Sequence, residues 1–150
     1  MRRLAEQTLT AIGRMTVAAT ELEYVLAWIA ADQVTGGGDR FGGTAGGDAR
    51  FRGGVGGAPA ALFSRPGEPL RAARRRAELA PPACRDQHVG LVEGAATQLA
   101  RGQAALRALW REDGGRTDPA VFDEITDRLL RCRDALHTLV QMHADGTNPA

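Results

Sequence analysis

The sequence predicts an all-α protein, a four-segment helical bundle with a long Gly-rich loop after the first helix. Apolar residues recur every three or four positions in three long stretches, which is the spacing of one helix face. An extended strand-like alternation of apolar and polar residues is absent. The 150 residues fit one domain, 1–150, that is large enough to bury a core.

The first predicted helix runs from about Arg3 to Gln33 and should be the spine of the fold. Glycines from Gly36 onward remove the helical preference and end it. Its core-facing stripe is Leu4, Thr8, Ile12, Met15, Ala19, Leu22, Leu26 and Ile29, widened by Tyr24, Val25 and Trp28.

Half of the residues from Gly36 to Gly57 are glycine. Ordering such a segment costs much backbone entropy, and its few apolar groups cannot offset that cost. We therefore predict a flexible Gly-rich loop over 36–67. Its tracts Arg-Phe-Gly-Gly at 40–43 and Arg-Phe-Arg-Gly-Gly at 50–54 are similar to the RGG-type tracts of RNA-binding proteins, although a plain loop is the simpler interpretation.

Three further helices are expected, over about Glu68 to Leu79, over Pro82 to Trp110, and from Asp118-Pro119 onward, with Asp118 as the N-cap. The tail 144–150 should fray. Their apolar stripes are Leu70, Ala73 and Ala77 in the first, Val89, Val92, Ala96, Leu99, Gln103, Leu106 and Trp110 in the second, and Phe122, Ile125, Leu129, Cys132, Leu136 and Leu139 in the third.

Gly90 and Gly94 lie inside the predicted 82–110 helix and share one face, because they are four residues apart. Glycine costs a helix about 1 kcal/mol relative to alanine. We expect the close approach of a neighbouring helix to explain both residues.

Composition excludes several classes of protein. The net charge of +1 gives no strong field toward nucleic acid or membrane, although all 19 cationic residues are arginine. The N-terminus lacks the continuous apolar core of a signal peptide, and the chain lacks a run of 18 apolar residues. Cys84 and Cys132 form no Cys-x-x-Cys motif. These features predict a cytoplasmic protein away from membranes, with both thiols reduced and buried.

The sequence gives no sign of a metal or cofactor site. His137 and His143 are six residues apart, which points them to different sides of a helix, and His88 lies far away in the chain. The only serine, Ser64, is not in a Gly-x-Ser-x-Gly turn. We expect neither a metal nor a cofactor.

The stretch LARGQAALRALW, Leu99 to Trp110, lies late in a long helix. Here the chain resembles HEPN-like proteins, small α-helical domains that include RNA-cleaving toxins and RNA-binding partners, whose motif often reads Arg-Asn-x-x-x-His. In this frame Gly102 replaces the arginine, with Arg101 one place early, Gln103 replaces the asparagine, and Arg107 replaces the histidine. The long first helix with Glu21-Leu22-Glu23-Tyr24 also looks like the opening helix of small actinobacterial proteins of this architecture.

The resemblance implies a histidine that activates or positions the ribose hydroxyl and an arginine that stabilises the phosphorane. Arginine cannot act as a neutral base at pH 7, so Arg107 should not support that chemistry. Phosphate or RNA contact could remain through Arg101 and Arg107. Packing with solvated arginines is the simpler interpretation. A second weak phosphate-binding set is Arg71, Arg74 and Arg75 in the arginine-rich 65–85 segment, where a solvated face is again the simpler interpretation.

A second match to the motif lies near the end of the chain, where Arg131 and His137 are six residues apart. Arg133 and His137 also share a helix face by their four-residue spacing. Arg131, Arg133 and His137 are therefore the weak catalytic candidates. The alternative is that these cations only suit the negative end of the helix dipole.

The favoured hypothesis is a non-catalytic interaction module of HEPN-like ancestry that binds a protein partner or RNA. HEPN-like folds typically dimerise, so a homodimer is expected, and Trp28 and Trp110 are candidates for its interface or for the core. The alternatives are a metal-independent ribonuclease that uses Arg131 or Arg133 with His137, and a structural or assembly protein.

Overall fold

The computed structural model describes residues 4–31, 63, 65–111 and 118–144. These residues form helices α1 (Glu6–Ala31), α3 (Glu68–Glu78), α4 (Pro82–Arg111) and α5 (Pro119–Ala144), and the described part of the chain holds no strand. The all-α prediction is confirmed. Most of the predicted 36–67 loop and the tail beyond Ala144 lie outside the described residues.

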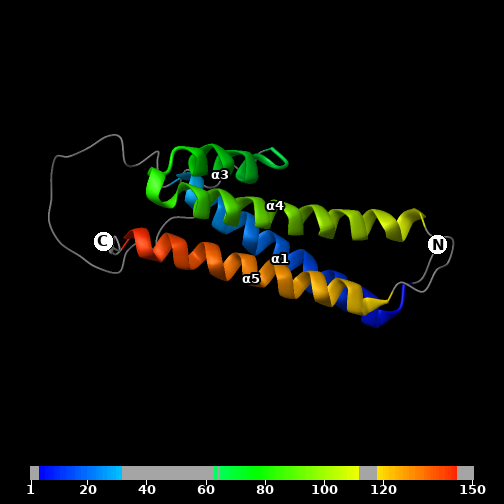
Figure 1. Cartoon of the computed structure of the whole chain (residues 1–150). Coiled ribbons are helices and arrows are strands. Elements are labelled where there is room, and N and C mark those ends of the chain that lie inside the picture. Colours follow the sequence, from blue (N-terminus) through cyan, green and yellow to red (C-terminus); the bar gives the residue numbers. More distant parts are fainter. Residues whose placement is uncertain (1–3, 32–62, 64, 112–117, 145–150) are drawn as a thin grey trace, which may run out of the picture.

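The three long helices share one bundle, and α3 covers one end of it (Figure 1). Helices α1 and α5 run side by side in the same direction and form the largest helix–helix contact, while α4 runs the opposite way. Helix α3 packs on α1 and α4. Helix α1 therefore contacts each of the other three described helices.

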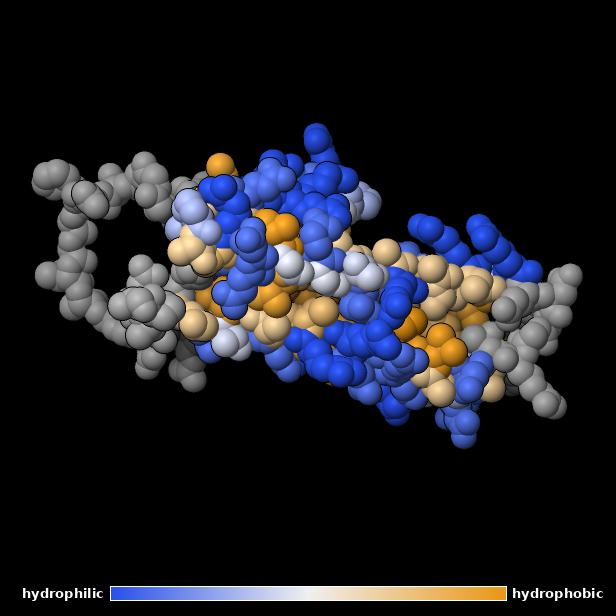
Figure 2. Space-filling model, viewed as in Figure 1, coloured by the Kyte–Doolittle hydropathy of each residue, from blue (hydrophilic) through white to orange (hydrophobic). Residues whose placement is uncertain are grey.

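The core lies between the long helices, and its large side chains are ones that the apolar spacing predicts, while Ala11, Ala18 and Ala95 are buried outside the predicted stripes. Figure 2 shows apolar residues in separate patches on this face, with hydrophilic residues between and around them. The largest fully buried side chains are Met15, Leu22, Leu26, Val92, Phe122, Leu129 and Leu136. The predicted stripes of α1 and α5 are thus confirmed in their main residues.

Four residues that the predicted apolar stripes place toward the core are exposed in the structure. Tyr24, Trp28 and Trp110 are 48%, 39% and 87% exposed, and Gln103 is exposed as well. Tyr24 and Trp28 lie on the outer side of α1, and Trp110 lies at the end of α4, where no described helix packs over the ring. Cys84 and Cys132 are only half-buried, and neither forms a disulfide with a described residue.

The ends of the helices follow from local chemistry. The backbone N–H of Ala120 donates to Oδ1 of Asp118 at 2.9 Å, so the predicted N-cap of α5 is confirmed. Gly67 precedes α3 with φ 75°, a left-handed conformation that costs a residue with a Cβ about 1 kcal/mol or more. Within the described residues, no helix is long and apolar enough to cross a membrane.

The predicted role of Gly90 and Gly94 is wrong. A Cβ added at either position would meet no described atom within 4 Å, so no described neighbour requires a glycine there. The close approach lies at Gly102 instead, where an added Cβ would be 3.6 Å from Met15 Sδ and 3.9 Å from Ile125 Cγ2. Spacing alone cannot tell which glycine faces a neighbour.

We expect Gly90→Ala and Gly94→Ala each to raise the free energy of unfolding by about 1 kcal/mol, because alanine favours the helix and meets open space. Gly67→Ala is the control, and it should lower the free energy of unfolding by about 1 kcal/mol because of its positive φ. Urea unfolding of the three variants measures both effects. A loss of stability in the two α4 variants would contradict the open surroundings of these glycines.

Candidate functional site

The predicted pair Arg133 and His137 lies in a hollow of about 540 Å³ between α1 and α5. The structure therefore brings together two of the three catalytic candidates. Their four-residue spacing places both on the same side of α5. The lining residues are Thr20, Glu21, Tyr24, Val25, Arg133, Asp134 and His137.

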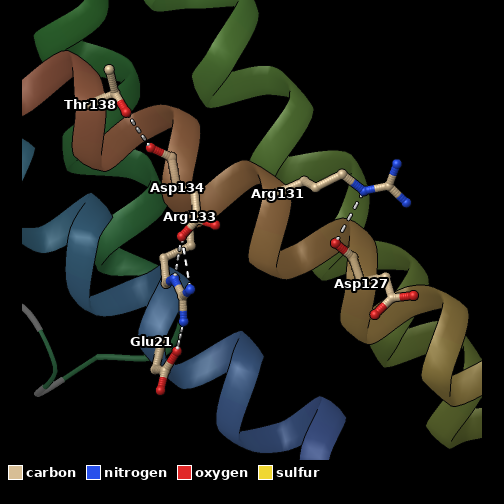
Figure 3. Close-up of polar contacts among 6 residues, drawn as sticks. All are labelled: Glu21, Asp127, Arg131, Arg133, Asp134 and Thr138. Atoms are coloured by element: carbon tan, nitrogen blue, oxygen red, sulfur yellow. Dashed lines mark hydrogen bonds and ion pairs between the residues drawn. The ribbon is translucent and has the colours of Figure 1, made fainter.

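The guanidinium of Arg133 is held by two carboxylates (Figure 3). Its Nη1 donates to Oε2 of Glu21 on α1. Its Nε and Nη2 donate to Oδ1 of Asp134 at 2.9 and 2.8 Å. The hydrogen bonds to Asp134 and then to Glu21 raise the pKa of Arg133 above its ordinary value. Because two carboxylates face one cation, the cluster is net negative and repels a phosphate.

Arg131 is not part of this site. Its Nε donates to the backbone oxygen of Asp127 at 3.3 Å. Figure 3 shows its side chain extending to a different side of α5 from Arg133, because two residues turn a helix by about 200°. An Arg131–His137 pair within this hollow is therefore excluded by the helix geometry.

A second hollow continues along the same two helices, with a volume of about 460 Å³, and shares Glu21 and Arg133 with the first. Its rim carries the ion pair of Arg14 Nη1 with Asp123 Oδ1 at 3.5 Å. We call the two hollows together the α1/α5 face. Its residues are Gly13, Arg14, Val17, Ala18, Thr20, Glu21, Tyr24 and Val25 of α1, and Thr126, Leu130, Arg133, Asp134 and His137 of α5.

The arginines of α3 are also paired. Arg71 and Arg75 both contact Glu68, at 3.1 and 2.9 Å. Arg74 forms a two-pronged contact with Glu93 of α4, at 2.7 and 3.0 Å. These contacts lower the pKa of Glu68, chiefly through Arg75 and then Arg71, and the pKa of Glu93 through Arg74. The cluster is thus largely compensated, and one of its arginines joins α3 to α4.

Arg101 and Arg107 are exposed on α4, and neither forms an ion pair with another described residue. Their spacing of six places them on different sides of the helix, and neither lines the Arg133 hollow. Other residues of the same stretch face inward. Leu99, Gly102 and Leu106 line a separate hollow between α1 and α4.

The described residues hold no group of three or more histidine, cysteine, aspartate or glutamate side chains that could bind a metal ion. His88 is buried in α4, and the side chain of His143 lies outside the described residues. Comparisons with protein-family models, curated proteins and solved structures find no match to this chain. The resemblance to HEPN-like proteins stays a prediction.

The Glu21–Arg133 contact should couple α1 to α5 energetically. In a double-mutant cycle with Glu21→Gln and Arg133→Gln, we expect a coupling of about 0.5 kcal/mol, since both side chains are partly exposed. The cycle of Glu21→Gln with Arg131→Gln is the control and should show no coupling. Urea unfolding measures both cycles, and equal couplings would contradict the geometry of this site.

Proposed function

We propose that the chain is a non-catalytic helical interaction module of HEPN-like ancestry, and that its α1/α5 face binds a second copy of the chain. The observation that carries this proposal is the exposed apolar surface of α1, set between ion pairs. Val17 is 59% exposed and Tyr24 is 48% exposed, one on each hollow of the face.

Burial of this surface would supply the driving force for association. Large apolar side chains in a continuous patch are typical of protein-binding sites, and burying one fully contributes about 1.5–3 kcal/mol. The half-buried Leu130 of α5 adds to the patch beside Val17. The surrounding ion pairs provide the polar rim that such interfaces usually have.

The charges on α1 favour a second copy as the partner. Arg14 and Glu21 are equally far from the midpoint between Val17 and Ala18. In an antiparallel pairing of two α1 helices about that midpoint, Arg14 of each copy faces Glu21 of the other, so each side chain adds a contact across the interface to the ion pair that it forms within its own chain. A two-fold interface requires this kind of self-complementary surface.

The ion pairs of the candidate arginines favour a protein partner over RNA. Binding of nucleic acid relies on protein cations that neutralise phosphates and so release the counterions condensed on the nucleic acid. Arg133, Arg71, Arg74 and Arg75 are instead each held by a carboxylate of the same chain. Arg101 and Arg107 remain, but they lie on different sides of α4 and offer no joint surface for a phosphate.

We expect the chain to sediment as a dimer, and Val17→Glu to weaken dimerisation by about tenfold or more, because it places a charge in the centre of the interface. Leu79→Glu is the matched control. Leu79 is 68% exposed but lies at the end of α3, outside the α1/α5 face, so this variant should dimerise normally. Sedimentation equilibrium measures the association. A monomeric parent chain, or equal effects of the two variants, would contradict the proposal.

The ribonuclease alternative rests on one observation, that Arg133 and His137 share a hollow with Thr20 and Tyr24. We expect the purified chain not to cleave RNA in EDTA, because the carboxylates of Glu21 and Asp134 neutralise the arginine that would stabilise a phosphorane. A fluorogenic RNA measures cleavage.

Cleavage that disappears in His137→Ala and remains in Arg131→Ala would overturn the non-catalytic proposal, since only His137 lies in the hollow. Salt-sensitive RNA binding without cleavage that is lost in the double variant Arg101→Ala and Arg107→Ala would instead make RNA the partner.

A further inference from the structure

A third hollow, of about 520 Å³, lies on another side of α1 and is not used by the proposed function. It opens between α1, α4 and the described residues 63 and 65–70. We call it the α1/α4 hollow. It is lined by Met15, Thr16, Ala19, Thr20, Glu23, Phe63, Arg65, Pro66, Gly67, Pro69, Leu70, Ala96, Leu99, Ala100, Gly102, Gln103, Leu106 and Leu129.

The hollow follows from the packing of α1 and α4. These two helices form the smallest of the helix contacts and diverge toward the end of α4 (Figure 1). The residues between them are small, with Ala19 on α1 and Ala96, Ala100 and Gly102 on α4. These small side chains leave a space between the two helices, and its volume lies within the range of small-molecule sites, about 300–1,000 Å³.

Glu23 is the one carboxylate among the lining residues. It is half-buried and forms no ion pair with a described residue. Burial alone raises its pKa above the ordinary value, so no neighbouring cation offsets the cost of desolvation. Arg65, the other charged residue of the lining, is exposed and is not ion-paired with Glu23. Within the described residues, Glu23 therefore has no cationic partner, and the apolar walls would strengthen its attraction to one.

Two other features of the hollow favour a cation beside Glu23, the threonine hydroxyls and an aromatic ring. The hydroxyls of Thr16 and Thr20 donate to backbone oxygens one turn earlier, each at 2.9 Å, which leaves their oxygens able to accept an N–H. The ring of Phe63 lines the hollow and stacks on Tyr24, with 6.1 Å between the ring centroids. An aromatic ring attracts a nearby ammonium group.

We infer that the α1/α4 hollow binds a small lipophilic amine, whose ammonium group pairs with Glu23 and whose apolar body lies against Leu70, Leu99 and Leu106. The positive charge restores the partner that the carboxylate lacks, in a place where the surrounding apolar groups strengthen the attraction. The apolar body removes the surface of three leucines from water.

Three compounds with one apolar body and different charge test this inference on the full chain. These are 4-phenylbutylamine, 4-phenylbutan-1-ol and 4-phenylbutyrate, and isothermal titration calorimetry measures their affinity. We expect the amine to bind at least about tenfold more tightly than the alcohol, as a charge-assisted hydrogen bond provides. The butyrate should not bind, because its carboxylate would face Glu23.

Glu23→Gln should reduce the affinity for the amine about tenfold, to that of the alcohol, and leave the alcohol unchanged. Glu6→Gln, which removes the same charge at an exposed position on the same helix, should change neither. Equal binding of amine and alcohol to the parent chain, an amine affinity that Glu23→Gln does not change, or no binding of the amine would each overturn the inference.

The pH dependence provides a readout of the same carboxylate. The affinity of the parent chain for the amine should rise with pH as Glu23 ionises, and that of Glu23→Gln should not, because glutamine does not ionise. Glu23→Gln should also unfold at a higher temperature than the parent chain at neutral pH. The unfolded chain ionises Glu23 at lower pH than the folded chain, so the parent loses stability as pH rises through the ordinary Glu range to the raised pKa. This gain shows that the variant is folded.

Discussion

The packing of α1 is the constraint on which the rest of the structure depends. Helix α1 contacts α3, α4 and α5, so it must bury residues along its whole length and still let three neighbours approach. Its buried positions alternate between the large Met15, Leu22 and Leu26 and the small alanines Ala11, Ala18 and Ala27. The large residues fill the centre of the bundle, and the small Ala18 lies between α1 and α5. Both the α1/α5 face and the α1/α4 hollow are surfaces that this single helix leaves uncovered.

The apolar spacing predicted the core because burial of one face determines which residues recur every three or four positions. The stripe of α5 from Phe122 to Leu139 is an example, as it needs only one packed face. The predicted burial of Tyr24, Trp28 and Trp110 was wrong, because spacing gives the side of a helix on which a residue lies, whereas burial depends on a neighbour being there. The alternative for Trp28 and Trp110, a dimer interface, stays a prediction. The same reason explains Gly90 and Gly94. Their shared face is real, but no described helix approaches it.

The candidate site shows a similar limit. The four-residue spacing of Arg133 and His137 correctly placed both in one hollow. The ion pair that engages the guanidinium of Arg133, however, involves Glu21, which is 112 residues away in the chain. That contact exists only because α1 and α5 run side by side in the same direction, a topology that local sequence patterns do not specify. The sequence likewise overstates the positive charge of α3, because Glu93, the partner of Arg74, lies on another helix. Charge counts along a segment overstate a patch when the compensating carboxylates come from elsewhere.

Glu21 and Glu23 show that the surroundings of a carboxylate determine which interactions it makes. The two carboxylates are two residues apart on one helix and belong to the same Glu-Leu-Glu-Tyr stretch. Helix geometry turns them by about 200°, so they enter different hollows. Glu21 meets a guanidinium, and the resulting pair joins two helices. Glu23 meets leucines, alanines and an aromatic ring, and its desolvation is not offset by a neighbouring cation. The first carboxylate is already engaged in holding the fold together, whereas the second has no ion-pair partner among the described residues and is the carboxylate that we propose to meet a ligand.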